Sequence, residues 1–295
     1  MKPIPKISIV TPNYNGAKYL EQTIQSVLNQ NYPNLEYLII DGGSTDASVE
    51  IIKKYSDKLS YWVSEPDKGL YDAIQKGFEK STGEIMAWIN SDDMYANGSF
   101  SIVSEVFSNF KQVNWLLGIP SAYDELGRTI KVDRFKRWSK FNYYTHDYEW
   151  IQQESVFWRR SLWEDSGSKI NSNLKFAGDL ELWMRFFRLE KLYTIDALLS
   201  GFRVRSSNQL SLEHLEDYHA EAKKLLKTEV NNHIPIEELK VVNTIIRLKE
   251  KSAKSHHLIR FFYNYTINKI IKTHFDFAPL FYFDRVTQSF KLLKS

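Results

Sequence analysis

Short apolar runs alternate with amphipathic helical runs over roughly the first ninety residues, and no other feature constrains the fold as strongly. Apolar runs at 6–11, 35–41, 59–64 and 84–89 predict strands. Helical spacing predicts helices over 17–30 and 70–80, and Ser44 or Thr45 is placed to cap a further helix that continues through Tyr55. Alternation of this kind is typical of a parallel sheet with helices on both faces. We therefore expect an α/β fold built on a mostly parallel sheet.

The rest of the chain is less regular. We expect a helix over 98–110, an irregular aromatic-rich stretch over 116–150, a strand over 152–158, a helix over 179–189 and a return to the sheet over 192–204. Nearly everything after Leu210 has a helical pattern. The chain is therefore expected to divide into a main domain, 1–210, with halves 1–95 and 96–210, and a C-terminal helical, basic and aromatic region, 211–295.

Composition excludes several classes of protein. A net charge of +3 is too small to argue for nucleic acid, and the absence of cysteine excludes disulfides and thiolate metal sites. The N-terminus has no signal-peptide pattern, and no apolar run approaches the ~18 residues that cross a bilayer. We expect a cytoplasmic protein. Charge is uneven, because residues 249–295 contain nine Lys or Arg against three Asp or Glu.

Polar residues stand where the expected strands end. Thr11 follows the first strand, Asp41 the second, and Asp92 and Asp93 the fourth. In open parallel sheets, ligands bind beyond the carboxyl ends of the strands. Two adjacent carboxylates with no His or Cys nearby suit a hard divalent cation such as Mg²⁺ or Mn²⁺. The plain alternative for Asp92 and Asp93 is a solvated turn.

Asp41 has a similar pair of interpretations. It is either an Asx turn or helix cap, or a carboxylate that accepts hydrogen bonds from a base or ribose. Gly42 and Gly43 follow it and permit close approach of a ligand to the backbone. The sequence contains neither G-x-G-x-x-G nor G-x-x-x-x-G-K-[ST], which excludes a standard dinucleotide fold and a P-loop.

Two stretches, SIVTPNYNGAKYLEQTIQSVLNQNYPNLEYLIIDGGSTDAS and EPDKGLYDAIQKGFEKSTGEIMAWINSDDMY, resemble the family 2 glycosyltransferases, which have the GT-A fold. The resemblance covers roughly residues 5–210. It implies an inverting transfer of a sugar from a nucleotide-diphosphate donor, usually a UDP-sugar, to an acceptor hydroxyl. Residues 1–95 would then be the nucleotide-binding half and 96–210 the acceptor and catalytic half.

The resemblance also implies roles for individual residues. Those that match the family's first nucleotide loop are Thr11, Pro12, Tyr14 and Asn15. Asp41 matches the aspartate that holds the base, and Asp92 and Asp93 fall in the acidic motif that binds ribose and the metal-diphosphate. Asp179 matches the catalytic base that deprotonates the acceptor. The residues expected near donor sugar and acceptor are Gln153, Glu154 and Trp183. The structural alternative for Asp179 is capping of the helix that follows Gly178.

Three positions depart from the family pattern. Asn90 stands where the acidic motif usually starts with aspartate, so coordination rests on Asp92 or Asp93. Gln75 replaces a usual Asn. Arg205 occupies the place of a frequent metal-ligand histidine, and arginine can bind a diphosphate instead. The Q-x-x-R-W motif of processive synthases is absent, which favours single addition.

The C-terminal region has an amphipathic pattern with a basic face. We expect one face to contain Ile259, Phe262, Tyr263, Thr266, Ile267, Ile270 and Ile271, and another to contain Arg260, Asn264, Asn268 and Lys272. Such a helix can lie on an anionic membrane. For this protein we expect that membrane surface to be the inner face of the cell membrane. The alternatives are a helical cap packed on the main domain or a homodimer contact. Aromatic residues from Tyr123 to Trp158, Tyr148 and Trp150 among them, are either an acceptor platform or core.

We therefore expect a glycosyltransferase that adds one hexosyl or N-acetylhexosaminyl unit to a lipid-linked or cell-surface glycan, in polysaccharide biosynthesis. Its partners would be the nucleotide-sugar, the glycan acceptor and a membrane surface. Two alternatives stay open. One is a catalytically silent nucleotide-sugar-binding or scaffold protein. The other is a sugar nucleotidyltransferase, although TPNYNGAKY does not resemble the Gly-rich basic loop of that class.

Overall fold

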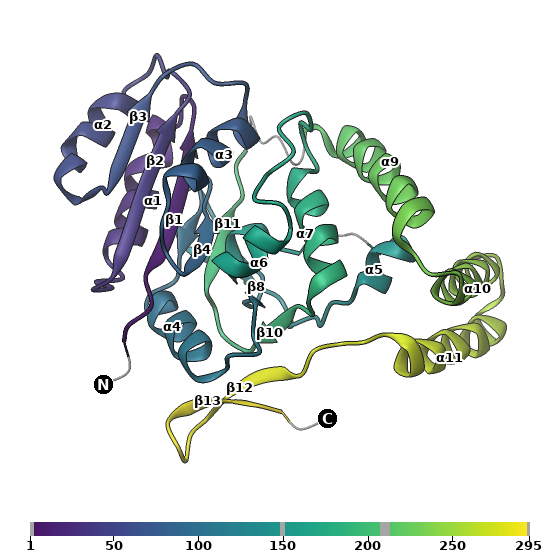
Figure 1. Ribbon diagram of the computed structural model, residues 1–295. Coiled ribbons are helices and arrows are strands. Elements are labelled where there is room, and N and C mark those ends of the chain that lie inside the picture. The colour runs from purple at the N-terminus through teal and green to yellow at the C-terminus, as the bar shows by residue number, and fades with distance from the viewer. Residues whose placement is uncertain (1–2, 148–150, 207–212, 294–295) are drawn as a thin grey trace.

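The computed structural model describes residues 3–147, 151–206 and 213–293 (Figure 1). Its main sheet has the strand order β13-β12-β10-β6-β9-β4-β1-β2-β3. The parallel part is formed by β1 (Ile7–Asn13), β2 (Leu35–Asp41), β3 (Tyr61–Ser64) and β4 (Ile85–Trp88). The elements between these strands are α1 (Ala17–Leu28), α2 (Ser48–Lys54), the 3-10 turn η1 (Ser56–Lys58) and α3 (Leu70–Lys80). The expected mostly parallel α/β fold is confirmed.

In the second half, one strand, β9, runs opposite to its neighbours in the sheet. After β5 (Met94–Tyr95) and α4 (Ser99–Asn109), the strands β6 (Trp115–Leu117) and β9 (Val156–Arg159) enter the sheet beside β4. β9 is antiparallel to both neighbours. The expected strand over 152–158 therefore begins later, because residues 153–155 form the 3-10 turn η2 (Gln153–Ser155). That turn and the end of β4 lie at the same edge of the sheet.

A small second sheet, β5-β11-β7-β8, covers one side of this edge. Its longer members are β7 (Ser121–Tyr123), β8 (Thr129–Val132) and β11 (Ser200–Arg203). The remaining elements of this half are α5 (Lys140–Tyr144), α6 (Arg160–Asp165), α7 (Gly178–Leu189) and β10 (Tyr193–Ile195). The expected return to the sheet over 192–204 is thus two strands, one in each sheet.

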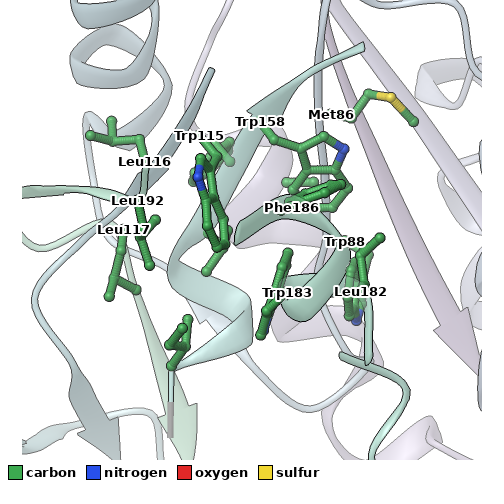
Figure 2. Packing of buried hydrophobic residues seen from close by; sticks show 14 of the residues in the cluster. Met86, Trp88, Trp115, Leu116, Leu117, Trp158, Leu182, Trp183, Phe186 and Leu192 are labelled. Atoms are coloured by element: carbon green, nitrogen blue, oxygen red, sulfur yellow. The ribbon is translucent and has the colours of Figure 1, made fainter. Parts of the chain in front are cut away.

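An aromatic core joins α7 to the main sheet (Figure 2). Trp88 at the end of β4 stacks on Trp183 of α7, with ring centroids 5.8 Å apart and an interplanar angle of 14°. Trp158 and Trp115 complete the cluster, and all four indoles are buried. Burial of aromatic surface of this size stabilises the fold strongly and fixes α7 against the strand that leads to the two aspartates.

The aromatic stretch between Tyr123 and Trp158 is mostly core. Trp138, Phe141, Tyr143 and Tyr144 are buried, and Phe135 is the exposed ring among the described residues of this stretch. The interpretation as an acceptor platform is therefore wrong for these four buried rings, which are core. Tyr148 and Trp150 lie outside the described residues.

The chain after residue 212 forms three helices and then returns to the sheet. These elements are α9 (Leu215–His233), α10 (Ile236–Ala253), α11 (His257–His274), β12 (Leu280–Asp284) and β13 (Ser289–Leu292). The helical expectation does not hold for the last two, because β12 pairs in parallel with β10 and β13 closes the sheet edge as a hairpin. The expected domain boundary at 210 falls outside the described residues. Among the described helices, none combines the length and apolarity needed to cross a membrane.

Candidate active site

Asp41 lies at the end of β2, directly opposite Asn13 of β1 in the parallel register. Its carboxylate is completely buried and accepts hydrogen bonds from Asn13 Nδ2 (2.6 Å), Ser44 N (2.9 Å) and Ser64 Oγ (2.6 Å). Burial raises the pKa of Asp41, but these donors outweigh burial and the net shift is downward. Asp41 therefore shapes the 42–45 loop, and a base contacts it only by displacing one of these donors. No sequence pattern pointed to Asn13 or Ser64 as its partners.

The first nucleotide loop divides into buried and exposed parts. Thr11 and Pro12 are buried in β1, and Thr11 Oγ1 lies 3.1 Å from the Tyr37 hydroxyl. Asn15 has a left-handed backbone (φ 50°), and its Oδ1 accepts a hydrogen bond from Thr45 N at 2.8 Å. Tyr14 is 67% exposed. Of the four expected loop residues, Tyr14 and Asn15 are thus exposed to a ligand, whereas Thr11 and Pro12 support the loop from inside.

The two adjacent aspartates have different environments. Asp93 is fully buried, and its carboxylate accepts hydrogen bonds from Arg203 N (2.8 Å) and Asn90 Nδ2 (3.3 Å). Asp92 keeps 20% of its side-chain surface exposed and forms an ion pair with Arg205, whose Nε lies 3.2 Å from Oδ2. Asp93 therefore joins β11 to the acidic turn, and Asp92 is the carboxylate that a ligand can reach.

Burial dominates the protonation of this pair. It raises the pKa of Asp92, while the charge of Arg205 partly lowers it. Burial also raises the pKa of Asp93 far above its usual range, and the negative charges of Asp92 and Glu154 raise it further. A positive charge placed beside Asp92 would therefore relieve a repulsion that the fold maintains.

Arg203 of β11 supports the acidic turn from the protein interior, and the sequence analysis did not single out this residue. The side chain is fully buried, donates from Nε to Asp92 O (2.5 Å) and from Nη2 to Gln22 Oε1 (2.9 Å), and lies over the ring of Tyr19. Burial lowers the pKa of Arg203, and Asp93 and Asp92 oppose that shift. An arginine within an apolar strand is the signal that was available, since arginine is almost never fully buried unless it is paired.

Arg205 is held in place by its neighbour in the chain. Ser206 donates to Glu125 Oε1 from both its backbone N (2.9 Å) and its hydroxyl (2.6 Å). The other oxygen of Glu125 accepts a hydrogen bond from Lys18 Nζ at 2.6 Å and one from Tyr19. Arg205 is thereby fixed beside Asp92, where a guanidinium can bind a diphosphate oxygen.

The turn η2 brings a third carboxylate to the site. Gln153 donates to the carbonyl of Trp88 (2.8 Å), which joins η2 to the end of β4. Glu154 is buried and accepts a hydrogen bond from Gln152 Nε2 at 2.5 Å. Burial raises the pKa of Glu154 to about 7, and the charges of Asp92 and Asp179 also raise it. Glu154 therefore lies within electrostatic range of both aspartates.

Asp179 is the second residue of α7, and one of its two carboxylate oxygens is unsatisfied. Its Oδ1 is buried and accepts no hydrogen bond from any described residue. Burial raises the pKa of Asp179 to about 6. The N-cap residue of α7 is Ala177, so the alternative interpretation of Asp179 as the capping residue is wrong. A carboxylate of this kind is suited to accept a proton.

Trp183 does not reach the site. Its side chain is 1% exposed and is enclosed by the aromatic core of Figure 2. The expectation that it contacts a sugar is therefore wrong, because helical spacing places it on the face of α7 that packs on the sheet. Gln75 is also structural, since its side chain bonds to Glu79, to Ser168 O and to Ile170 N.

The site offers a divalent cation few protein ligands. Within the described ranges, no group of three or more His, Cys, Asp or Glu side chains is arranged to hold a metal ion. Mg²⁺ and similar ions are commonly held by one or two carboxylates together with substrate phosphates. The accessible Asp92 provides such a carboxylate, so the residues fit a cation that binds together with a diphosphate.

A mostly parallel sheet flanked by helices, with an acidic turn at its carboxyl edge, has the architecture of the GT-A fold. The model of the family described as "Glycosyl transferase family 2" matches residues 8–161. The chain belongs to this family and is a glycosyltransferase.

Two curated relatives illustrate the sequence similarity. An uncharacterized glycosyltransferase of Rickettsia typhi is 27% identical over 244 residues, which cover 77% of this chain and 74% of that protein. An uncharacterized glycosyltransferase of Haemophilus influenzae is 38% identical over 117 residues, which cover 39% of this chain and 43% of that protein.

Solved structures share the fold. S. aureus TarS 1-349 in complex with UDP-GlcNAc matches with a TM-score of 0.66 at 19% identity, covering 90% of this chain and 81% of that one. The mannosyltransferase PcManGT from Pyrobaculum calidifontis, in complex with GDP-Man and Mn²⁺, matches with a TM-score of 0.57 at 15% identity. That match covers 92% of this chain and 80% of the other.

Proposed function

We propose that this glycosyltransferase moves one sugar from a UDP-sugar to an acceptor hydroxyl with inversion at the anomeric carbon. The observation that supports this most is Asp179, whose buried Oδ1 lacks a hydrogen-bond partner among the described residues and whose pKa is raised to about 6. An inverting transfer needs one base on the acceptor side and one charge-stabilising group on the leaving-group side. Asp179 and Arg205 supply this pair.

In the proposed transfer, one bond forms, one bond breaks and one proton moves. The acceptor oxygen forms a bond to the anomeric carbon from the face opposite the diphosphate, and its proton passes to Asp179. The bond between the anomeric carbon and the diphosphate oxygen breaks, and the electron pair leaves with the nucleoside diphosphate. Arg205, held beside Asp92 by their ion pair, stabilises the developing charge.

Asp92 is the residue that we propose to hold a divalent cation, Mn²⁺ or Mg²⁺. It is the accessible member of the aspartate pair, whereas both oxygens of Asp93 already accept hydrogen bonds within the protein. When bound, the cation would supply positive charge to the diphosphate. The fold neighbour solved with GDP-Man and Mn²⁺ supports this assignment by analogy.

A UDP-sugar is proposed as donor on two grounds. The motifs of residues 8–161 belong to family 2, and the fold neighbour TarS has been solved with UDP-GlcNAc. We propose that Tyr14, Asn15 and Asp41 contact the nucleoside, and that Gln153 and Glu154 line the sugar side. The absence of Q-x-x-R-W supports addition of a single sugar.

The test is a panel of UDP-glucose, UDP-galactose, UDP-GlcNAc, UDP-GalNAc and GDP-mannose, each scored for hydrolysis and thermal stabilisation with and without Mn²⁺. We expect one UDP-sugar to be turned over in a Mn²⁺-dependent manner, with release of the inverted anomer detected by NMR. Release of the retained anomer would contradict the mechanism. Binding without any turnover, even with added glycan acceptors, would favour the silent nucleotide-sugar-binding alternative.

We further propose a lipid-linked or cell-surface glycan as acceptor, with the enzyme peripheral on the inner face of the membrane. The supporting surface is the outer face of α11, on which five apolar residues are more than half exposed: Leu258, Ile259, Phe261, Phe262 and Tyr265. Residues 251–275 contain five Lys or Arg and no Asp or Glu, which complements an anionic bilayer. Figure 1 shows α10 and α11 side by side, far from β1–β3.

This face differs from the expected one. Ile267 is buried, and Arg260 and Asn264 hydrogen-bond to Ser252 at the end of α10. The side of α11 that contains Ile267 therefore packs against the protein, whereas Arg260 and Asn264 stay exposed while they bond to Ser252. The rings of Phe261 and Phe262 are the ones that can enter a membrane interface.

Co-sedimentation with vesicles tests this surface. The intact protein is expected to bind phosphatidylcholine vesicles that contain phosphatidylglycerol at low salt, and to bind pure phosphatidylcholine weakly. Phe261→Ser with Phe262→Ser should abolish binding, whereas Val286→Ser, a control at a 91% exposed apolar residue, should not. If the double variant changes the oligomeric state and leaves vesicle binding unchanged, the face is a homodimer contact instead.

A further inference from the structure

The position of the Asp179 carboxylate depends on the backbone at the start of α7. Its Oδ1 has no hydrogen-bond partner among the described residues, and the N-cap residue of α7, Ala177, cannot cap the helix with its side chain. The amide groups at a helix start need acceptors from elsewhere when the N-cap residue provides none. The residues that supply these acceptors therefore decide where the carboxylate stands.

Glu221 of α9 supplies the acceptor for the N-cap amide, Ala177 N, and also binds the two amides that precede it. Its Oε1 accepts a hydrogen bond from Lys175 N at 3.0 Å, and its Oε2 accepts from Phe176 N at 2.9 Å and Ala177 N at 2.8 Å. Three consecutive backbone amides are thus bound by one carboxylate that lies 44 to 46 residues further along the chain. A negative charge at this end of α7 also matches the helix dipole.

Two further contacts fix the same segment. The hydroxyl of Tyr71, on α3, donates to Phe176 O at 2.9 Å, and its ring lies so close to Gly178 that a Cβ there would approach the ring Cζ to 2.6 Å. At the start of α9, the ring of His214 stacks on Phe176 at 4.9 Å. The segment 175–178 is therefore held between α3 and α9.

The helix α9 is itself anchored to α7 further along. Arg188, in the last turn of α7, forms a bidentate ion pair with the buried Glu229 of α9, with 2.8 Å between Arg188 Nε and Glu229 Oε1. The hydroxyl of Tyr144 lies 3.3 Å from the same carboxylate. α7 and α9 are thus joined at both ends of α7, which makes Glu221 part of a rigid support.

We propose that Glu221 is a positioning residue for catalysis, through which the C-terminal helical region holds Asp179 at the acceptor side of the site. This inference rests on the proposed role of Asp179 as the base. It makes α9 a required part of the catalytic unit, although the family model ends at residue 161.

The test compares Glu221→Ala with Glu216→Ala, a control at an exposed carboxylate on the same helix. The substrate is the sugar nucleotide with the highest rate in the panel above, and active enzyme is counted by calorimetric binding of UDP with Mn²⁺. We expect kcat of Glu221→Ala to fall by about 10- to 100-fold with an unchanged KM for the donor, because a base displaced by about 1 Å costs this much. Glu216→Ala should match the wild type.

A pH profile of Glu221→Gln separates positioning from a merely structural role. Asp179 is faced by Tyr71 of α3, Tyr143 of α5, Glu154 of η2 and Glu221 of α9. Glu221→Gln keeps an acceptor but removes one negative charge, so the acid limb of kcat/KM should move to lower pH. This variant also decides the question if Glu221→Ala fails to fold.

The inference is overturned if the limb of Glu221→Gln coincides with that of the wild type, or if folded Glu221→Ala keeps kcat within twofold of Glu216→Ala. Either result leaves the proposed function intact as long as Asp179→Asn is inactive. An Asp179→Asn variant with wild-type kcat would instead overturn the proposed function itself, so the two failures are distinguishable.

Discussion

At the scale of single residues, the site depends on how differently neighbouring carboxylates are solvated. Asp93 is buried and fully hydrogen-bonded, Asp92 is accessible and paired with Arg205, and Asp179 has one buried oxygen without a hydrogen-bond partner among the described residues. The same functional group therefore acts as a structural connector, as a proposed cation ligand and as a proposed base. Environment and not residue type separates these roles.

Asp179→Asn is expected to lower kcat by about 10²- to 10⁴-fold, the range that loss of a general base typically costs. UDP binding should persist, because the proposed nucleoside contacts come from the loop after β1 and from the end of β2. The measurement is steady-state transfer together with calorimetric titration of UDP and Mn²⁺. Wild-type kcat in this variant would exclude Asp179 as the base.

Activity should also depend on pH in a defined direction. A base must be deprotonated to act, and burial raises the pKa of Asp179 to about 6. We therefore expect kcat/KM to rise with pH through about 6 and to be largely lost at pH 5. A profile that is flat between pH 5 and pH 8 would contradict the assignment.

Asp92→Asn and Asp93→Asn should fail in different ways. We expect Asp92→Asn to weaken Mn²⁺-dependent binding of UDP by at least about tenfold with little change in stability, because Asp92 is accessible. Asp93→Asn keeps one acceptor oxygen but leaves one of the two donors, Arg203 N or Asn90 Nδ2, without its acceptor, and should lower the free energy of unfolding by about 1–3 kcal/mol. Calorimetry and thermal unfolding measure both quantities, and exchange of the two phenotypes would refute the assignment.

At the scale of elements, a carboxylate at the amino end of the sheet joins neighbouring strands. Glu36 on β2 accepts hydrogen bonds from Ser8 of β1 (2.5 Å), from Thr82 N (2.6 Å) and from the Thr82 hydroxyl (2.7 Å), and it pairs with Lys6. Burial raises the pKa of Glu36, yet Lys6 and these donors lower it to about 2. The link holds the entry to β4 against β1 and β2.

Glu36→Gln tests this link. Because the folded-state pKa lies below the ordinary glutamate value of 4.5, Glu36 stabilises the fold fully above that value and loses its contribution as pH falls towards about 2. At pH 7 the variant should be less stable by about 1–3 kcal/mol, and the difference should shrink between pH 4.5 and pH 2. Urea unfolding at several pH values measures it, and a pH-independent difference would contradict the linkage.

At the scale of the whole molecule, the C-terminal hairpin belongs to the main sheet. Phe281 of β12 is fully buried and packs edge-on against Phe110 with 4.8 Å between ring centroids. β12 and β13 thereby cover the edge that β10 would otherwise expose. The hairpin of β12 and β13 is therefore part of the main sheet and stabilises the fold.

Phe281→Ala should lower the free energy of unfolding by about 3–5 kcal/mol, the typical cost of removing a buried phenyl ring. Val286→Ser in the hairpin turn is the control, because Val286 is 91% exposed and should have almost no effect. Thermal unfolding of both variants checks this. An unchanged midpoint for Phe281→Ala would mean that the hairpin is not part of the cooperative unit.

The sequence by itself determined the parallel sheet, the family and the edge of the sheet where the site lies. Strand and helix periodicities are local, and the carboxyl ends of parallel strands must meet at one edge. Asp41 and Asp92 could therefore be placed near one another from this pattern alone, and the family resemblance added Asp179.

The tertiary structure alone decided which residues perform each role. Contacts between segments far apart in the chain decide which of Asp92 and Asp93 is accessible and make Trp183 face the core. Contacts of the same kind let Arg203 and Glu221 support the two halves of the site. Burial and hydrogen-bond partners are properties of packing, and no local pattern encodes them. That is why the sequence located the site, whereas the fold assigned its groups.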